Sequence, residues 1–185
     1  MENVVKLISW VNPLSIVLRP RLVLTSGKPR CREAVAALYD PPCPALYLRV
    51  WVYNFGLSPA LNCSVFVNRV LRDGQILDDE RSPLNWTDID TFQPQILPTR
   101  EHRGRYADVC AASERMPSLQ IKSQKGTRGY GIYTEAGVYS LEISAETPNR
   151  LTSIGRIRMD VNYEGRWNGL SLIAVTALGK HRRWW

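Results

Sequence analysis

Residues that could carry out chemistry are few and scattered in this chain. It has four cysteines and two histidines, His102 and His181. His102 lies in the charged stretch Arg100–Arg103, which indicates a solvent-facing position, and no serine lies in a G-x-S-x-G motif. Nucleophilic catalysis needs a base held beside a nucleophile or a metal. No C-x-x-C pair and no zinc-ligand spacing of cysteine with histidine is present. We therefore expect no catalytic residue, no metal site, no cofactor and no small-molecule substrate.

Two further segments suggest ligand binding but lack the required pattern. Lys125–Gly131 (KGTRGYG) has no GK[ST] motif, and no helix-forming run follows that could offer its N-terminus to a phosphate. The acidic residues between Asp78 and Asp90 do not follow the spacing of an EF-hand calcium loop. We interpret the first segment as a hairpin-like loop and the second as a solvated acidic loop.

The cysteines indicate the redox setting. Cys63 and Cys110 lie in strand-like runs, and the N-terminus has neither the basic start nor the cleavage site of a signal peptide. Buried reduced thiols and a cytoplasmic location, including at a membrane surface, are therefore expected. A Cys63–Cys110 bridge stays open as an alternative in an oxidising compartment.

The fold class follows from Leu46–Asn54 (LYLRVWVYN). Its aliphatic residues at even positions fall on one face of an extended chain, and Tyr47, Arg49, Trp51 and Tyr53 fall on the other. Such a run of β-branched, aromatic and aliphatic residues without Gly or Pro predicts a strand. The residues Asn54-Phe55-Gly56 tolerate positive φ and predict a reversal into a second, paired strand, Asn62–Leu71.

The other elements complete an all-β chain. Residues 1–14 predict a short amphipathic helix, residues 15–178 a single β-sandwich domain, and residues 179–185 a basic and aromatic tail. One helical turn is expected at Arg32–Leu38, and Ile76–Thr99 is expected to be irregular. Further strands are predicted at Ser15–Leu24, Arg105–Ala111, Ser118–Lys122, Val138–Ala145, Thr152–Tyr163 and Leu170–Thr176.

The expected core lies between two sheets. Alternation within the predicted strands assigns to it Val50, Val52, Val65, Val67, Val109, Leu141, Ile143, Ile157 and Met159. The large side chains of Trp51 and Trp86 are expected to close it.

The most specific motif is Glu135–Ile143 (EAGVYSLEI). It resembles the entry to strand F of immunoglobulin-like domains, where an acidic residue, a glycine and a tyrosine precede a core strand. The resemblance implies a sandwich of about seven to nine antiparallel strands. It also implies that the Tyr139 hydroxyl, after Gly137, bonds to an upstream backbone group. Leu141 stands where that family has its second disulfide cysteine.

A wider strand series is similar to CARDB-type domains, which are immunoglobulin-like modules of bacterial proteins. Val52-Tyr53-Asn54-Phe55-Gly56 matches their V-x-N-x-G strand, and Ile96–Glu101 matches a later turn, with Thr99 where that turn has glycine. The resemblance covers about residues 45–163. It implies a bacterial or phage origin and a non-catalytic binding or spacer unit, and it lends a function class only loosely.

Two kinds of partner are expected. The first is another protein, or a second copy of this chain, contacted by Trp86 and Phe92 in the long acidic loop. The alternative is a nucleic acid or an anionic membrane surface, because the net charge is +7. Residues 1–72 and 115–185 each carry a net charge of +6, and residues 73–114 carry −5, which can also neutralise them within the fold. The residues of this alternative are Arg156, Arg158, Lys180, Arg182, Arg183, Trp184 and Trp185.

Overall fold

The computed structural model describes residues 19–37, 42–87, 94–98, 103–124, 131–148 and 155–178. The predicted helix at residues 1–14 and tail at residues 179–185 lie outside these ranges. The described chain is all-β, with two short 3-10 turns, η1 (Pro29–Cys31) and η4 (Trp167–Gly169). Its strands are β1 (Leu22–Thr25), β2 (Arg32–Ala37), β3 (Cys43–Asn54), β4 (Ala60–Arg72), β5 (Gln75–Asp78), β6 (Ser82–Pro83), β7 (Asn85–Trp86), β8 (Gln95–Leu97), β9 (Arg105–Ser113), β10 (Leu119–Ile121), β11 (Ile132–Tyr133), β12 (Gly137–Glu146), β13 (Gly155–Tyr163) and β14 (Leu170–Ala177).

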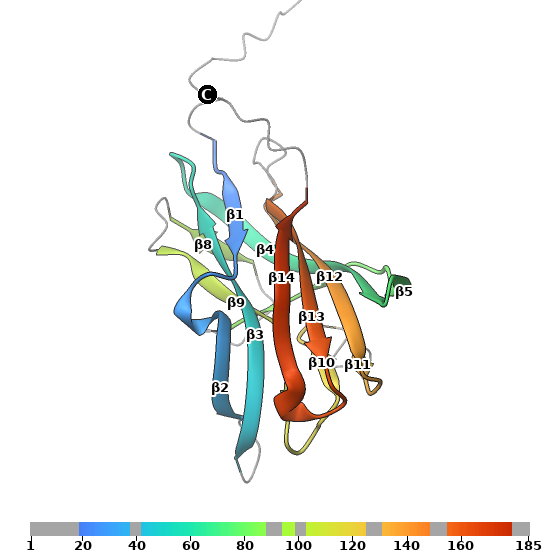
Figure 1. Ribbon diagram of the computed structural model, residues 1–185. Helices are drawn as coiled ribbons and strands as arrows, with labels where there is room; N and C mark the ends of the chain where they lie inside the picture. The colour runs from blue at the N-terminus through green and yellow to red at the C-terminus, as the bar shows by residue number, and fades with distance from the viewer. Residues whose placement is uncertain are drawn as a thin grey trace, which may run out of the picture.

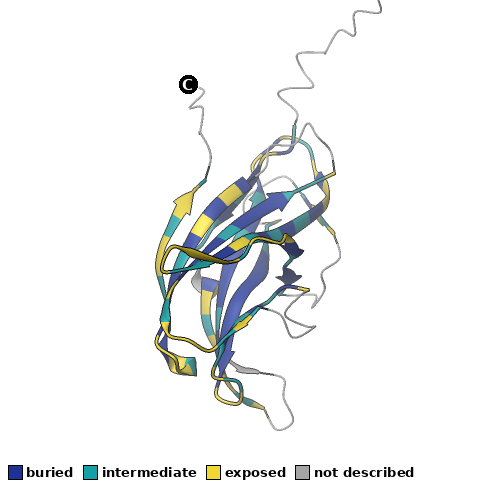
Figure 2. Ribbon diagram, turned by 90° about the vertical axis from the view of Figure 1, so that its right-hand side faces the viewer, coloured by how far each residue is buried: buried dark blue, intermediate teal, exposed yellow. Residues whose placement is uncertain are grey.

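The strands form two antiparallel sheets, each of seven described strands. The first sheet has the order β1-β3-β9-β10-β11, with β2 beside β3 and β7 beside β9. The second sheet has the order β14-β13-β12-β4-β5, with β6 and β8 beside β4. Figure 1 shows the two layers, and both present a buried face (dark blue in Figure 2). The two sheets contain more strands than the seven to nine expected because very short strands, such as β6 and β7, are included.

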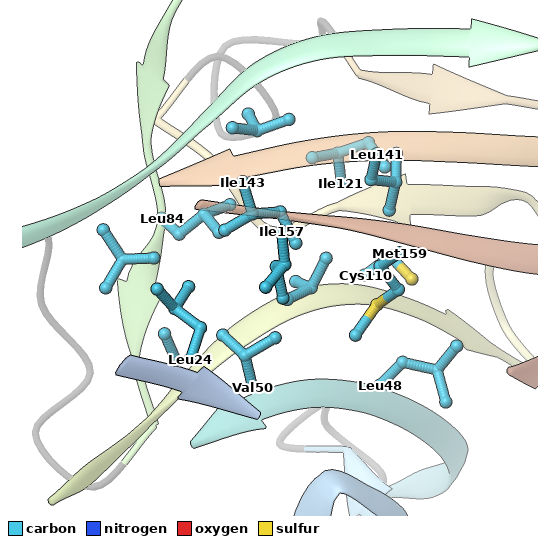
Figure 3. Close-up of a cluster of buried hydrophobic side chains, with 14 of the residues drawn as sticks. Leu24, Leu48, Val50, Leu84, Cys110, Ile121, Leu141, Ile143, Ile157 and Met159 are labelled. Carbon is cyan, nitrogen blue, oxygen red and sulfur yellow. The ribbon is translucent and has the colours of Figure 1, made fainter. Parts of the chain in front are cut away.

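The core lies between the two sheets, as predicted. All nine predicted core residues are buried there, and Figure 3 shows side chains of both sheets in this layer, among them Leu48, Val50, Ile143 and Met159. Trp86 belongs to this core and is only 1% exposed. The prediction for Trp51 is wrong: it lies half-buried on the outer face of β3, where its ring packs 4.6 Å from that of Tyr106. Strand alternation places Trp51 opposite Val50 and Val52, so it cannot face the core.

The predicted pairing of β3 with β4 is also wrong, because the chain crosses from one sheet to the other between them. The buried amide of Asn54 fixes this crossing. Its Oδ1 accepts hydrogen bonds from the backbone N–H groups of Arg21 and Gly56, both at 2.9 Å, and its Nδ2 donates to the Ser58 carbonyl at 2.6 Å. Gly56 does not have a positive φ. Glycine is needed because a Cβ there would lie 2.2 Å from the Arg19 carbonyl oxygen.

Two local predictions fail because tertiary pairing decides the conformation. Residues Arg32–Ala37 form strand β2 instead of a helical turn, since each of them pairs with a residue of β3. The segment expected to be irregular, Ile76–Thr99, contains β6, β7 and β8 and most of β5, which pair with β4 or β9. Sequence propensity is weak in such short segments.

The predicted bond of Tyr139 is present. Its hydroxyl donates to the Glu135 carbonyl at 2.7 Å, and the side chain is fully buried. Gly137 has a φ of +156°, and a Cβ at this position would lie 3.0 Å from the Asp73 carboxylate and 3.2 Å from the Arg72 side chain. The motif therefore fixes the start of β12 against the turn that follows β4.

Candidate functional site

The residues predicted to contact a protein partner are not assembled on a described surface. Trp86 pairs with Ala107 of β9, and its ring is enclosed in the core. This burial supports its predicted part in closing the core and leaves none of its ring for a partner to contact. Phe92 lies outside the described residues.

The predicted basic face is only partly basic. Arg156 and Arg158 both lie on the outer face of β13 and are exposed. Arg158 Nε donates to Asp160 Oδ1 at 2.8 Å, and its Nη2 donates to the Ser140 hydroxyl at 2.7 Å, so its charge is compensated. Arg156 forms no ion pair with any described residue. The other five residues of this prediction lie in the tail beyond residue 178, outside the described ranges.

The outer face of the first sheet holds a buried ionic cluster that no motif in the sequence indicates. Arg49 is 5% exposed. Its Nε donates to Asp108 Oδ1 at 2.7 Å, and its Nη1 donates to the Glu33 carboxylate. Thr87 Oγ1 also donates to Asp108 Oδ1, at 2.6 Å. The register between β3 and β9 shifts beside Arg49, and this irregularity lets Asp108 lie opposite it.

The electrostatics of this cluster indicate a structural role. Burial by itself would lower the pKa of Arg49, but the hydrogen bonds and charges of Asp108 and Glu33 outweigh it and raise the pKa. The guanidinium also lies 5.1 Å from the centre of the Tyr47 ring. The arginine is thus charged, hydrogen-bonded and covered, so it cannot bind a ligand without losing these partners.

The buried thiols offer no reactive site. The four cysteines are free, and burial raises the pKa of Cys63 to about 12 and that of Cys110 further. Thiols that stay protonated are poor nucleophiles and poor metal ligands. Within the described ranges no three His, Cys, Asp or Glu side chains gather as metal ligands would. The same ranges contain no helix with the length and apolar character needed to span a membrane.

The accessible edge of the second sheet is strand β14, Leu170–Ala177 (LSLIAVTA). Among the described strands it pairs with β13 alone. Leu170 and Leu172 point toward the core, whereas Ile173, Ala174, Thr176 and Ala177 are exposed, as the yellow segments of the strand leading to the marked C-terminus show in Figure 2. The strand has no charged residue and no proline.

The other described edges are protected in the ways natural sheets use. Strands β11 and β5 have two and four residues, and β5 ends in Asp78. Strand β1 has four residues and follows Pro20, while β2 carries Arg32 and Glu33. Strand β14 lacks these protections apart from a bulge near Ile173. One signal for this site can be read from the sequence, namely the absence of charged residues from 170–177.

Comparison with known proteins adds no relative from which a role could be carried over: no family model, no curated protein and no solved structure matches this chain.

Proposed function

We propose that this chain is a non-catalytic interaction module with an immunoglobulin-like fold. Two features support this class of sandwich. The first is the buried Tyr139 hydroxyl bonded back to the Glu135 carbonyl at the start of β12. The second is the division of strands, with β3 and β9 in one sheet and β4, β12 and β13 in the other. The free, buried Cys63 and Cys110 support a cytoplasmic setting.

The observation that carries the proposal is the uncharged edge of β14. Unpaired N–H and C=O groups of an edge strand can hydrogen-bond to a strand from another protein, and this mode of binding is called strand addition. A second copy of this chain supplies a matching edge, because two β14 strands related by a twofold axis run antiparallel. Exposed Ile173 and Ala174 then add apolar contact, and no like charges oppose each other.

Self-association is tested by light scattering after size exclusion over a range of protein concentrations. We expect a concentration-dependent dimer. Thr176→Lys places a charge on an exposed position of β14 and should shift the protein to monomer. Gln75→Lys adds the same charge at an exposed position of β5 and should leave the dimer intact. A strict monomer at every concentration, together with a pull-down in which Thr176→Lys retains the same proteins as the unmodified chain, would contradict strand addition.

A second candidate function is binding to nucleic acid through Arg156, Arg158 and the tail. The observation that favours it is the hydrogen bond from the Leu178 N–H to the Arg156 carbonyl, at 2.9 Å. This bond holds Leu178, the last described residue, beside the exposed Arg156, and the sequence continues with Lys180, Arg182 and Arg183. Retention on single-stranded DNA should fall steeply with salt, since each neutralised phosphate contributes about −0.7 to the logarithmic slope. Deleting residues 180–185 should reduce the affinity and the slope. Retention that is negligible at low salt would exclude this function.

A further inference from the structure

Four large apolar side chains are exposed together at one end of the sandwich. Phe55 is 68% exposed, Leu57 64%, and Leu61 and Ile96 57% each. We call this set the apolar end. The first three lie on or directly after the crossing between β3 and β4, and Ile96 lies on β8 between two residues that pair with β4 at Ala60 and Cys63. The Asn54 amide also donates to the Leu97 carbonyl, at 3.4 Å, and so links the crossing to β8.

The packing of the crossing directs these side chains outward. Gly56 is buried against the backbone of Arg19 and Pro20, where no side chain fits. Because Gly56 occupies the inward position, Phe55 and Leu57 on either side of it face solvent. Asn54 holds this arrangement through hydrogen bonds to the backbone of Arg21, Gly56 and Ser58. The exposure of Phe55 and Leu57 therefore follows from a backbone conformation that the hydrogen bonds of Asn54 hold in place.

Four arginines surround the same end. The Phe55 N–H donates to the Arg21 carbonyl at 2.8 Å, and Arg19 contacts Gly56. Arg105 pairs with Val52 near the end of β3. Arg156 follows Gly155, whose backbone lies against Leu22. None of the four forms an ion pair with a described residue, and Arg21 and Arg156 are exposed. Glu146, also at this end, is neutralised by Arg81 at 2.6 Å.

We propose that the apolar end docks on an anionic lipid membrane. In this arrangement Phe55, Leu57, Leu61 and Ile96 enter the boundary between headgroups and acyl chains, while the exposed arginines, Arg21 and Arg156, contact lipid phosphates. Exposed apolar side chains flanked by arginine suit a bilayer surface, because the bilayer offers anionic headgroups and apolar chains at adjacent depths. A nucleic acid would use the arginines but leave these side chains in water. The inference is independent of strand addition at β14.

The course of the chain supports this orientation. Strand β1 begins and β14 ends at this end (Figure 1). Beyond Leu178 the sequence continues with three basic residues and two tryptophans, Lys180 to Trp185. Tryptophan and basic residues are the types enriched at membrane interfaces.

Vesicle cosedimentation with the full chain tests the proposal. Vesicles of phosphatidylcholine with added phosphatidylserine should bind the protein, and vesicles of phosphatidylcholine alone should bind it much less. Phe55→Ser with Leu57→Ser should weaken binding by about tenfold or more, because the apolar contact is lost. Arg21→Gln with Arg156→Gln should weaken binding and reduce its dependence on salt.

The matched control is Ile76→Ser with Leu77→Ser. These residues are 56% and 40% exposed on β5, which pairs with the opposite end of β4, so this variant should bind vesicles like the unmodified protein. A circular dichroism spectrum confirms that each variant is folded. The proposal is overturned if the unmodified chain does not sediment with anionic vesicles, or if the folded Phe55 and Leu57 variant binds them equally well. Binding to single-stranded DNA without binding to vesicles would assign the arginines to nucleic acid instead.

Discussion

Arg49 and Phe55 lie close together in the sequence and reverse the usual rule of burial. The charged Arg49 is 5% exposed, whereas the aromatic Phe55 is 68% exposed. Arg49 is buried because Glu33, Asp108 and Tyr47 take the place of water around its guanidinium. Phe55 is exposed because its neighbour Gly56 occupies the buried position. Available partners, rather than residue type, therefore decide which of these two side chains the fold encloses.

Removal of a partner of Arg49 should have the largest effect on stability. Asp108→Ala leaves a buried guanidinium with only part of its countercharge, and it also deprives Thr87 of its acceptor. Breaking a buried ion pair in this way typically costs about 3–5 kcal/mol. We expect a loss of about 3 kcal/mol in the free energy of unfolding, since Glu33 remains. Denaturant unfolding at neutral pH measures it.

The double variant Arg49→Met with Asp108→Leu is the control. Apolar side chains of similar volume can replace a buried ion pair at little cost. The double variant should therefore recover most of the stability that Asp108→Ala loses. If both variants were equally unstable, packing rather than charge would explain the effect, and the ionic account of Arg49 would be wrong.

The contrast between Arg49 and Phe55 also shows what the sequence could and could not predict. The alternation in Leu46–Asn54 correctly predicted that Arg49 faces away from the core. It could not predict that Arg49 is buried, because Glu33 and Asp108 lie 16 and 59 residues away in the chain. Gly56 was recognised as a break after β3. Its close contact with Arg19, which turns Phe55 outward, depends on tertiary structure.

The same limit explains the errors in the fold. Alternation fixed the long strands β3, β4, β12 and β13 and the core, because burial of one face dominates there. Whether β4 joins the sheet of β3 or the opposite sheet depends on contacts of β4 with β12, which are remote in sequence. The outward position of Trp51 followed from alternation, but its contact with Tyr106 required the pairing of β3 with β9.

Tyr133 differs from Arg49 because it is partly buried beside Asp78, whose charge has the same sign as that of a tyrosinate, and a pH titration measures the consequence. Burial, with the negative charge of Asp78, raises its pKa from 10.0 to about 12. The unfolded chain therefore loses this proton first, and the stability present below pH 10 is lost as the pH rises toward 12. We expect the thermal midpoint to fall across this window. Tyr133→Phe should make the fall shallower, and an identical fall in this variant would exclude Tyr133 as a cause.

Tyr139→Phe tests a single buried hydrogen bond. It removes the hydroxyl that donates to the Glu135 carbonyl and leaves the ring in the core. Loss of such a bond costs about 1 kcal/mol. The effect should be smaller than that of Asp108→Ala because no charge is left without a partner. Denaturant unfolding at neutral pH measures the loss. If the denaturant concentration at the midpoint and the slope of the free energy against denaturant were both unchanged, this hydrogen bond would not stabilise the fold.

The smallest effect is expected at Phe55 itself. Phe55→Ser with Leu57→Ser changes two side chains that are mostly in water already, and Gly56 and Asn54 keep the crossing in place. The free energy of unfolding should change by about 0.5 kcal/mol or less, as for other surface substitutions. A loss of 3 kcal/mol, comparable with that of Asp108→Ala, would mean that these side chains are covered by the folded chain itself. Unchanged stability together with lost vesicle binding would separate the two regions: the partners of Arg49 lie within the fold, and those of Phe55 lie outside it.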